Sequence, residues 1–112
     1  MQISNYSTNE ILSEWQAKLM LFRDIKQHVK NGIVLSISGE DGGTWILQPF
    51  QLSRVTSKID DSDCTISLDT DTLNSIYTGE ITPQEAYLAG KLKIMGNESV
   101  ALFFSSLMLK EV

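Results

Sequence analysis

The stretch from Asp63 to Asn97 constrains the fold more than any other part of the chain. It begins with strand-like alternation of apolar and polar residues, changes to helical spacing, breaks at Thr78-Gly79 and restarts at Pro83. A second alternating segment around Leu92 then completes it. Glycine is typical just after a helix and proline at a first helical position. The stretch therefore predicts two strands joined by two short helices, with apolar faces and no group suited to covalent chemistry.

An amphipathic helix is predicted near the N-terminus. Ser7-Thr8-Asn9-Glu10 has the form of a capping box, and apolar residues then recur at spacings of three and four. The stripe consists of Ile11, Leu12, Trp15, Leu19, Phe22, Ile25 and Val29. It predicts one helix of about 20 residues that stops at Asn31-Gly32 and covers a sheet.

A hairpin follows this helix. Alternation starts at Ile33, a turn is predicted at Glu40-Asp41-Gly42-Gly43, and alternation resumes until about Pro49. The polar segment Leu52 to Ile59 predicts a third strand or an edge ribbon. The chain ends with a helix capped by Asn97 or Ser99 and apolar around nearly its whole circumference. Its apolar residues are Val100, Leu102, Phe103, Phe104, Leu107, Met108 and Leu109.

Composition indicates one soluble domain over residues 1–112, placed in the cytoplasm by default. The net charge is −5, with nine basic against fourteen acidic residues, which argues against a nucleic-acid partner and against adhesion to anionic membranes. No apolar run approaches the roughly 18 residues that stable membrane insertion needs. The N-terminal residues do not resemble a signal peptide.

Candidate catalytic and metal-binding residues are few. Cys64 stands next to Asp63, which disfavours a thiolate, so the sequence predicts a packed strand thiol. His28 has no ligand or carboxylate at a useful spacing. Asp69, Asp71 and Glu80 match the first, third and last positions of a calcium-binding loop. Leucine and asparagine stand where that loop needs an oxygen ligand and a glycine, so we predict no metal, no cofactor and no enzyme.

The apolar strand faces carry the functional inference. Leu35/Ile37, Trp45/Leu47, Ile66/Leu68 and Leu92/Ile94 are predicted to lie on one side of a sheet. Segments around Leu73/Ile76 and Tyr87/Leu88, together with the final helix, would cover that side. The pattern alone leaves open whether these groups fill an ordinary core or enclose a cavity.

A family resemblance bears on that choice. The segments DCTISL at Asp63, YTG at Tyr77, PQEA at Pro83 and GKLKIMGN at Gly90 stand in the order and spacing of the sterol carrier protein type 2 lipid-binding domain. The resemblance covers Asp63 to Leu109 well, the hairpin with Trp45 next, and the first helix more loosely.

The resemblance implies an α+β fold: a five-stranded, mainly antiparallel sheet with helices packed on one face and an apolar tunnel between them. The implied function is non-catalytic binding or transfer of a fatty acid, a fatty acyl-CoA or an isoprenoid-like lipid. The residues that we predict to contact lipid are Leu35, Ile37, Trp45, Leu47, Ile66, Leu68, Leu73, Ile76, Phe103, Phe104 and Leu107.

The chain departs from the family in two respects. It ends in Lys110-Glu111-Val112 instead of a peroxisomal address, and it is acidic where the best-known carriers are basic. These departures favour a short stand-alone member of prokaryotic type and disfavour sterol as the ligand. The alternative function is a protein-interaction module, in which the apolar final helix forms a homodimer or docks on a lipid-modifying enzyme.

Overall fold

The computed structural model describes residues 6–21, 29–48, 51–55 and 62–108. Its helices are α1 (Thr8–Met20), α3 (Thr70–Thr78), α4 (Pro83–Leu88) and α5 (Glu98–Met108). Its strands are β1 (Ile33–Ser38), β2 (Gly43–Gln48), β3 (Gln51–Val55), β4 (Cys64–Asp69) and β5 (Leu92–Gly96). The predicted α+β class is confirmed.

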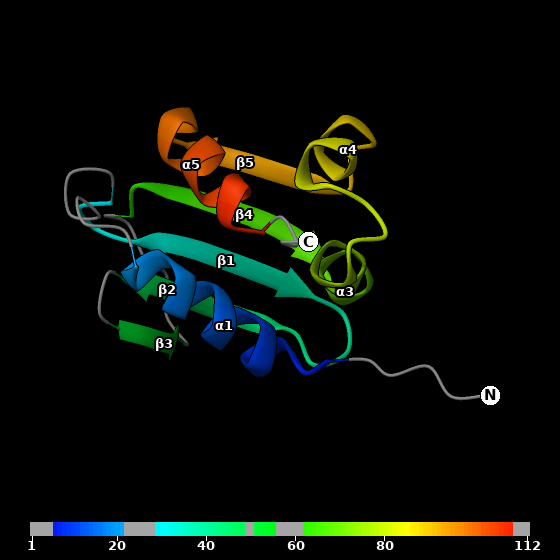
Figure 1. The fold of residues 1–112 in the computed structure, drawn as a ribbon, viewed down its shortest axis with the longest axis horizontal. Coiled ribbons are helices and arrows are strands. Elements are labelled where there is room, and N and C mark those ends of the chain that lie inside the picture. Colours follow the sequence, from blue (N-terminus) through cyan, green and yellow to red (C-terminus); the bar gives the residue numbers. More distant parts are fainter. Residues whose placement is uncertain (1–5, 22–28, 49–50, 56–61, 109–112) are drawn as a thin grey trace.

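The five strands form one sheet in the order β3-β2-β1-β4-β5. The central pair β1/β4 is parallel, and the other three pairs are antiparallel, so the prediction of a mainly antiparallel sheet is confirmed. In Figure 1, α1 lies in front of the β1–β2 side of the sheet and α5 in front of the β4–β5 side, whereas α3 and α4 stand near one end of the strands. The helices thus occupy one face.

The face of the sheet under the helices carries most of the apolar residues of the strands. In one row across the sheet, Trp45 pairs with Leu35, Leu35 with Ile66, and Ile66 with Ile94. The other face is more mixed: it carries hydroxyl residues, such as the paired Ser36 and Ser67, and also the buried apolar pair Val34 and Ile46. Strand alternation predicted this division because successive side chains point to opposite faces.

The first helix begins where the sequence predicts it. The Ser7 side chain accepts from the Glu10 amide and the Glu10 carboxylate accepts from the Ser7 amide, which completes the capping box. The helix ends at Met20, however, so the prediction of a continuous helix to Asn31 is wrong. The Leu21 amide donates to the Lys18 carbonyl at 3.1 Å, which tightens the last turn. Residues 22–28, including Phe22, Ile25 and His28, lie outside the described residues.

The hairpin turn between β1 and β2 depends on Gly42. A β-carbon at this position would stand 2.5 Å from the Ile37 carbonyl oxygen, so no larger residue fits. The neighbouring Asp41 has a φ of 61°, and its carboxylate accepts from the Thr8 amide at 2.7 Å. The turn therefore also holds the start of α1 against the sheet. The predicted edge strand is confirmed as β3 over Gln51–Val55, and residues 56–61 lie outside the described residues.

The Asp63 side chain fixes the start of the parallel pair. Its Oδ2 atom accepts from the amides of Lys30, Asn31 and Gly32 at 2.8, 2.9 and 3.2 Å. The Asp63 amide donates to the Gly32 carbonyl, and the Asp63 carbonyl accepts from the Asn97 amide, each at 2.9 Å. One residue thus connects the entry to β1, the start of β4 and the exit from β5.

Local caps set the remaining helices as predicted. Asp69 caps α3 by accepting from the Thr72 amide at 2.7 Å, and Gly79 ends that helix with a φ of 85°. Thr82 caps α4. The Asn97 side chain caps α5 by accepting from the Ser99 and Val100 amides.

Cys64 is the packed strand thiol that the sequence predicts. It is 1% exposed and pairs with Gly96 across the sheet. Burial, and secondarily the neighbouring Asp63 carboxylate, raises the pKa of the Cys64 thiol to about 11. The folded chain therefore keeps this thiol protonated at neutral pH, which makes it a poor nucleophile.

We predict that Asp63→Ala lowers the free energy of unfolding by about 2 kcal/mol, since it leaves three amide donors without their charged acceptor. Urea unfolding followed by tryptophan fluorescence measures the change. Asp71→Ala is the matched control, because exposed Asp71 only stands in the first turn of α3, and it should cost at most about 0.5 kcal/mol. Equal effects of the two substitutions would contradict this role of Asp63.

A second prediction concerns alkaline pH. Because the pKa of Cys64 is about 11 in the fold against an ordinary 9.0, the unfolded chain releases its thiol proton first as the pH rises. Stability from this group is therefore complete below pH 9 and is lost up to about pH 11, by about 2 kcal/mol. Cys64→Ala should flatten the fall in unfolding free energy over this range. An unchanged slope in the variant would refute the prediction.

Candidate ligand site

An apolar groove runs between α4 and α5 over the edge strand β5. Its volume is about 620 Å³. Buried Leu92 and partly buried Ile94 form the floor. The groove residues are Thr82, Pro83, Gln84, Tyr87, Leu88, Leu92, Ile94, Glu98, Leu102, Ser105 and Ser106.

Each wall of the groove is one face of a helix. On α4 the lining residues recur as Pro83 and Tyr87, and as Gln84 and Leu88, which is one helical turn apart in both cases. The α4 direction is set at its start by a complete capping box between Thr82 and Glu85, with proline at the next position. The sequence therefore determines which side of α4 meets the groove.

The α5 wall explains why the final helix is apolar on nearly all sides. One face is buried in the core, where Phe104 meets the Trp15 ring edge-on at a centroid distance of 6.0 Å. A second face, with Glu98, Leu102 and Ser105, belongs to the groove. The core face and the groove face together account for the excess of apolar residues on α5. Leu109 lies outside the described residues.

Several large apolar side chains at the groove are unusually open to solvent. Leu88 is 75% exposed, Leu102 is 69% exposed and Tyr87 is 50% exposed. Such clustering of exposed apolar groups is uncommon on a monomeric surface and marks a place where something apolar binds. The groove is thus the strongest candidate for a ligand site among the described residues.

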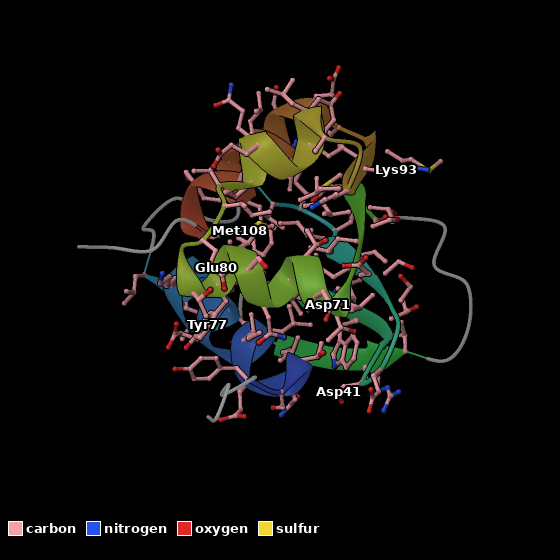
Figure 2. The ribbon with its side chains drawn as sticks, turned by 90° about the vertical axis from the view of Figure 1, so that its right-hand side faces the viewer. Asp41, Asp71, Tyr77, Glu80, Lys93 and Met108 are labelled. Carbon is pink, nitrogen blue, oxygen red and sulfur yellow. The ribbon has the colours of Figure 1, made fainter. Side chains whose placement is uncertain are left out.

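The polar groups of the groove provide little chemistry. Ser105 donates its hydroxyl proton to the Ala101 carbonyl at 2.8 Å, and Ser106 donates to the Phe103 carbonyl at 2.6 Å. Glu98 is the one charged residue among those that line the groove in the described part of the chain. Lys93 of β5 points away from the helices in Figure 2. The arrangement suits binding, since it pairs no nucleophile with a base.

The predicted lipid contacts lie in the hydrophobic core and not in the lining of this groove. Ten of them are at most 5% exposed and pack into one hydrophobic core: Leu35, Ile37, Trp45, Leu47, Ile66, Leu68, Leu73, Ile76, Phe104 and Leu107. Phe103 is partly buried and packs against that core. The structure brings all of them together, and their contact with a ligand stays a prediction.

The groove residues were only partly visible from the sequence. Tyr87, Leu88, Leu92 and Ile94 were predicted to cover or form the apolar sheet face, but not to contact the ligand. The signal that selects Leu102 is the apolar excess of the final helix. The sequence of the final helix does not indicate which of its apolar residues remain outside the core.

Two other hollows are polar. One of about 300 Å³ lies among α1, α3 and the end of α5, where the Tyr77 hydroxyl donates to the Glu14 carboxylate at 3.1 Å. Partial burial, followed by the Glu14 carboxylate, raises the pKa of Tyr77. In Figure 2, Tyr77 lies at one end of α3 and Asp71 at the other. This hollow has no apolar lining comparable to that of the groove.

The other hollow, of about 590 Å³, gathers acidic residues near the hairpin turn. Its carboxylates bind backbone groups: Asp41 accepts from Thr8, and Asp69 caps α3. The Thr72 hydroxyl and then its amide lower the pKa of Asp69, with a last contribution from Lys91. Within residues 6–21, 29–48, 51–55 and 62–108, no group of three or more His, Cys, Asp or Glu side chains is placed to hold a metal ion.

The helices in the described part of the chain are too short or too polar to cross a membrane.

Comparison with known proteins assigns the family. The model of the SCP-2 sterol transfer family matches residues 9–109. Hydroxysteroid dehydrogenase-like protein 2 of Bos taurus is 34% identical over 101 residues, which is 78% of this chain and 23% of that protein. Sterol carrier protein 2 of Oryctolagus cuniculus is 29% identical and is matched over 94% of this chain and 20% of that protein. The chain thus spans about a fifth of the length of these relatives.

Solved structures share the fold. Palmitated sterol carrier protein 2-like 2 of Aedes aegypti has a TM-score of 0.74 at 17% identity, covering 95% of this chain and 97% of that one. Sterol carrier protein 2 of Aedes aegypti in complex with palmitate has a TM-score of 0.71 at 18% identity, covering 96% and 100%. The family model matches residues 9–109, and the sheet order of the chain agrees with the fold of these solved structures. The chain therefore belongs to the SCP-2 sterol transfer family.

Proposed function

We propose that the chain binds one hydrophobic ligand with a single chain, such as a fatty acid or an isoprenoid-like lipid, in the groove between α4 and α5, and transfers it without covalent chemistry. The observation that carries this proposal is the exposed apolar lining of the groove over Leu92 and Ile94. Its volume of about 620 Å³ falls within the usual size of small-molecule sites.

Burial of the ligand chain supplies the affinity. Each methylene removed from water contributes about 0.8 kcal/mol, so a long alkyl chain gains several kcal/mol even after its ordering cost. The ligand also covers Leu88 and Leu102, which are otherwise open to water. Both partners therefore lose unfavourable contact with solvent on binding.

The predicted core contacts offer a path for the far end of the ligand. Leu92 and Ile94 on the groove floor pair across the sheet with Leu68 and Ile66 of β4. A chain that enters the groove and continues beneath α5 would pass over these residues towards Phe104 and Leu107. In this proposal α5 is the movable wall, because ligand entry must separate it from β4.

The relatives support the ligand class. Two solved structures with the same fold are a palmitated protein and a palmitate complex, and another, with a TM-score of 0.59, is a ubiquinone synthesis protein. Those ligands and pathways belong to those proteins. Fatty acyl-CoA is the weakest of the candidate ligands here, since its phosphates would meet Glu98 and no cation among the groove residues.

The proposal excludes catalysis by this chain. Cys64 is buried with a raised pKa, and the groove serines give their protons to helix carbonyls. The hydroxysteroid dehydrogenase-like relatives are matched over about a fifth of their length, so their remaining parts have no counterpart in residues 9–109.

We predict that Leu102→Asp weakens binding of pyrene-labelled dodecanol at least tenfold, because it places a charge on the apolar wall. Fluorescence titration measures the dissociation constant. Leu21→Asp is the matched control, since Leu21 is 81% exposed and is not a groove residue. It should bind the probe within about twofold of the wild type.

Native mass spectrometry of protein purified from cells complements this titration and should show a co-purified lipid. Absence of any lipid there, together with no binding of the pyrene probe, would refute the proposed function. Equal loss of affinity in the Leu21 and Leu102 variants would refute the location of the site.

Self-association is the second candidate function. The exposed Tyr87, Leu88 and Leu102 side chains favour it, because one surface patch can serve both copies of a homodimer. Sedimentation velocity separates the two functions. A lipid-bearing monomer supports the carrier, whereas a lipid-free dimer that Leu102→Asp dissociates supports the interaction module. Leu102 suits this test better than Phe103, which packs against the core.

A further inference from the structure

The groove walls differ in the hydrogen-bonding groups that they offer a ligand head group. On α5, the hydroxyl protons of Ser105 and Ser106 are already donated to carbonyl groups of the same helix, at 2.8 and 2.6 Å. Their oxygen atoms can then only accept. The Glu98 carboxylate is likewise an acceptor when ionised. The α5 wall therefore binds hydrogen-bond donors.

The α4 wall is different. Gln84 has an amide that donates and accepts, and the Tyr87 phenol retains a proton that it can donate. Thr82 accepts from the Glu85 amide at 3.0 Å and keeps its own hydroxyl proton. A head group between the walls thus meets acceptors on α5 and uncharged donors on α4.

No positive charge balances Glu98 within the described groove. Lys93 of β5 points away from the helices, as Figure 2 shows. Lys91 lies near Asp69, and it is not a groove residue. Among the described residues that line the groove, none is lysine or arginine. An anionic head group would therefore meet a like charge without compensation.

Capping side chains already occupy several backbone amides at the two helix starts beside the groove. The Ser99 and Val100 amides of α5 donate to the Asn97 side chain at 2.9 and 3.2 Å. At α4, the Glu85 amide donates to Thr82 and the Thr82 amide donates to the Glu85 carboxylate. These amides are occupied, so they are not available to hold a carboxylate or a phosphate.

Resting on the proposed function, we infer that the groove selects a single-chain lipid whose head is an uncharged hydroxyl, such as a long-chain alcohol or a polyisoprenol, over one with a carboxylate or phosphate head. A hydroxyl group can donate to Glu98 or Ser105 on α5 and accept from Gln84 or Tyr87 on α4. An ionised carboxylate can only accept, and it is repelled by Glu98.

The test compares pyrene-labelled dodecanol with pyrene-labelled dodecanoic acid at about pH 8, where a free carboxylic acid is ionised. The two probes share chain and fluorophore and differ in the head group. An alcohol enters any apolar site more readily than an ionised acid. The decisive quantity is therefore the ratio of the two dissociation constants in variants relative to the wild type.

Glu98→Lys should shift the ratio of the two dissociation constants about tenfold in favour of the acid, because it reverses the charge at the α5 wall. Glu98→Gln should shift the ratio in the same direction by a smaller factor. Asp71→Lys and Asp71→Asn are the controls, because each changes the net charge by the same amount as the corresponding Glu98 variant. Asp71 lies on an exposed part of α3 and is not a groove residue, so these variants should leave the ratio unchanged. Circular dichroism establishes that each variant is folded.

Three outcomes would overturn the inference. The first is a wild type that binds the acid as tightly as the alcohol. The second is a ratio that does not move in either Glu98 variant, and the third is an equal shift in the Asp71 controls. All three leave lipid binding intact, whereas failure of the wild type to bind either probe would overturn the proposed function as well.

Discussion

The structure depends on the contact of one carboxylate with three backbone amides. The Asp63 side chain holds the amides of residues 30–32, and its backbone joins β4 to Gly32 on one side and Asn97 on the other. These Asp63 contacts fix the register of the parallel pair β1/β4. The register in turn aligns the row of apolar residues under the helices. Since Asn97 also caps α5, the same contact positions the helix that forms one wall of the groove.

The groove exists because the last helix has more apolar surface than the core can bury. Phe104 and Trp15 use one face of α5, and α4 stands far enough away to leave Leu102 uncovered. A small domain normally minimises such exposure, so an exposed apolar wall is a cost that a ligand can remove. In the function that we propose, the neighbouring polar groups select the head group of the ligand.

Much of the fold could be predicted from the sequence, because its signals are local. Each of these signals concerns residues that are close together in sequence. They are the capping residues Ser7, Asp69 and Thr82, the turn at Gly42 and the alternation of the strands. The end of α1 could not be predicted in this way. Its apolar stripe continues to Val29, which is buried but lies outside the helix, so the spacing of buried residues extends further than the helix itself. The roles of Asp63 and Leu102 depend on contacts distant in sequence, which no local pattern contains.

All the groove residues fall within one continuous segment, from Thr82 to Ser106. The first helix, the hairpin and the central strands supply none of the groove residues. If the proposed preference for a head group is correct, it can be altered within this segment while the rest of the sheet stays the same. A relative of different preference could donate the segment as a unit, provided that Leu92 and Ile94 keep their pairing with β4.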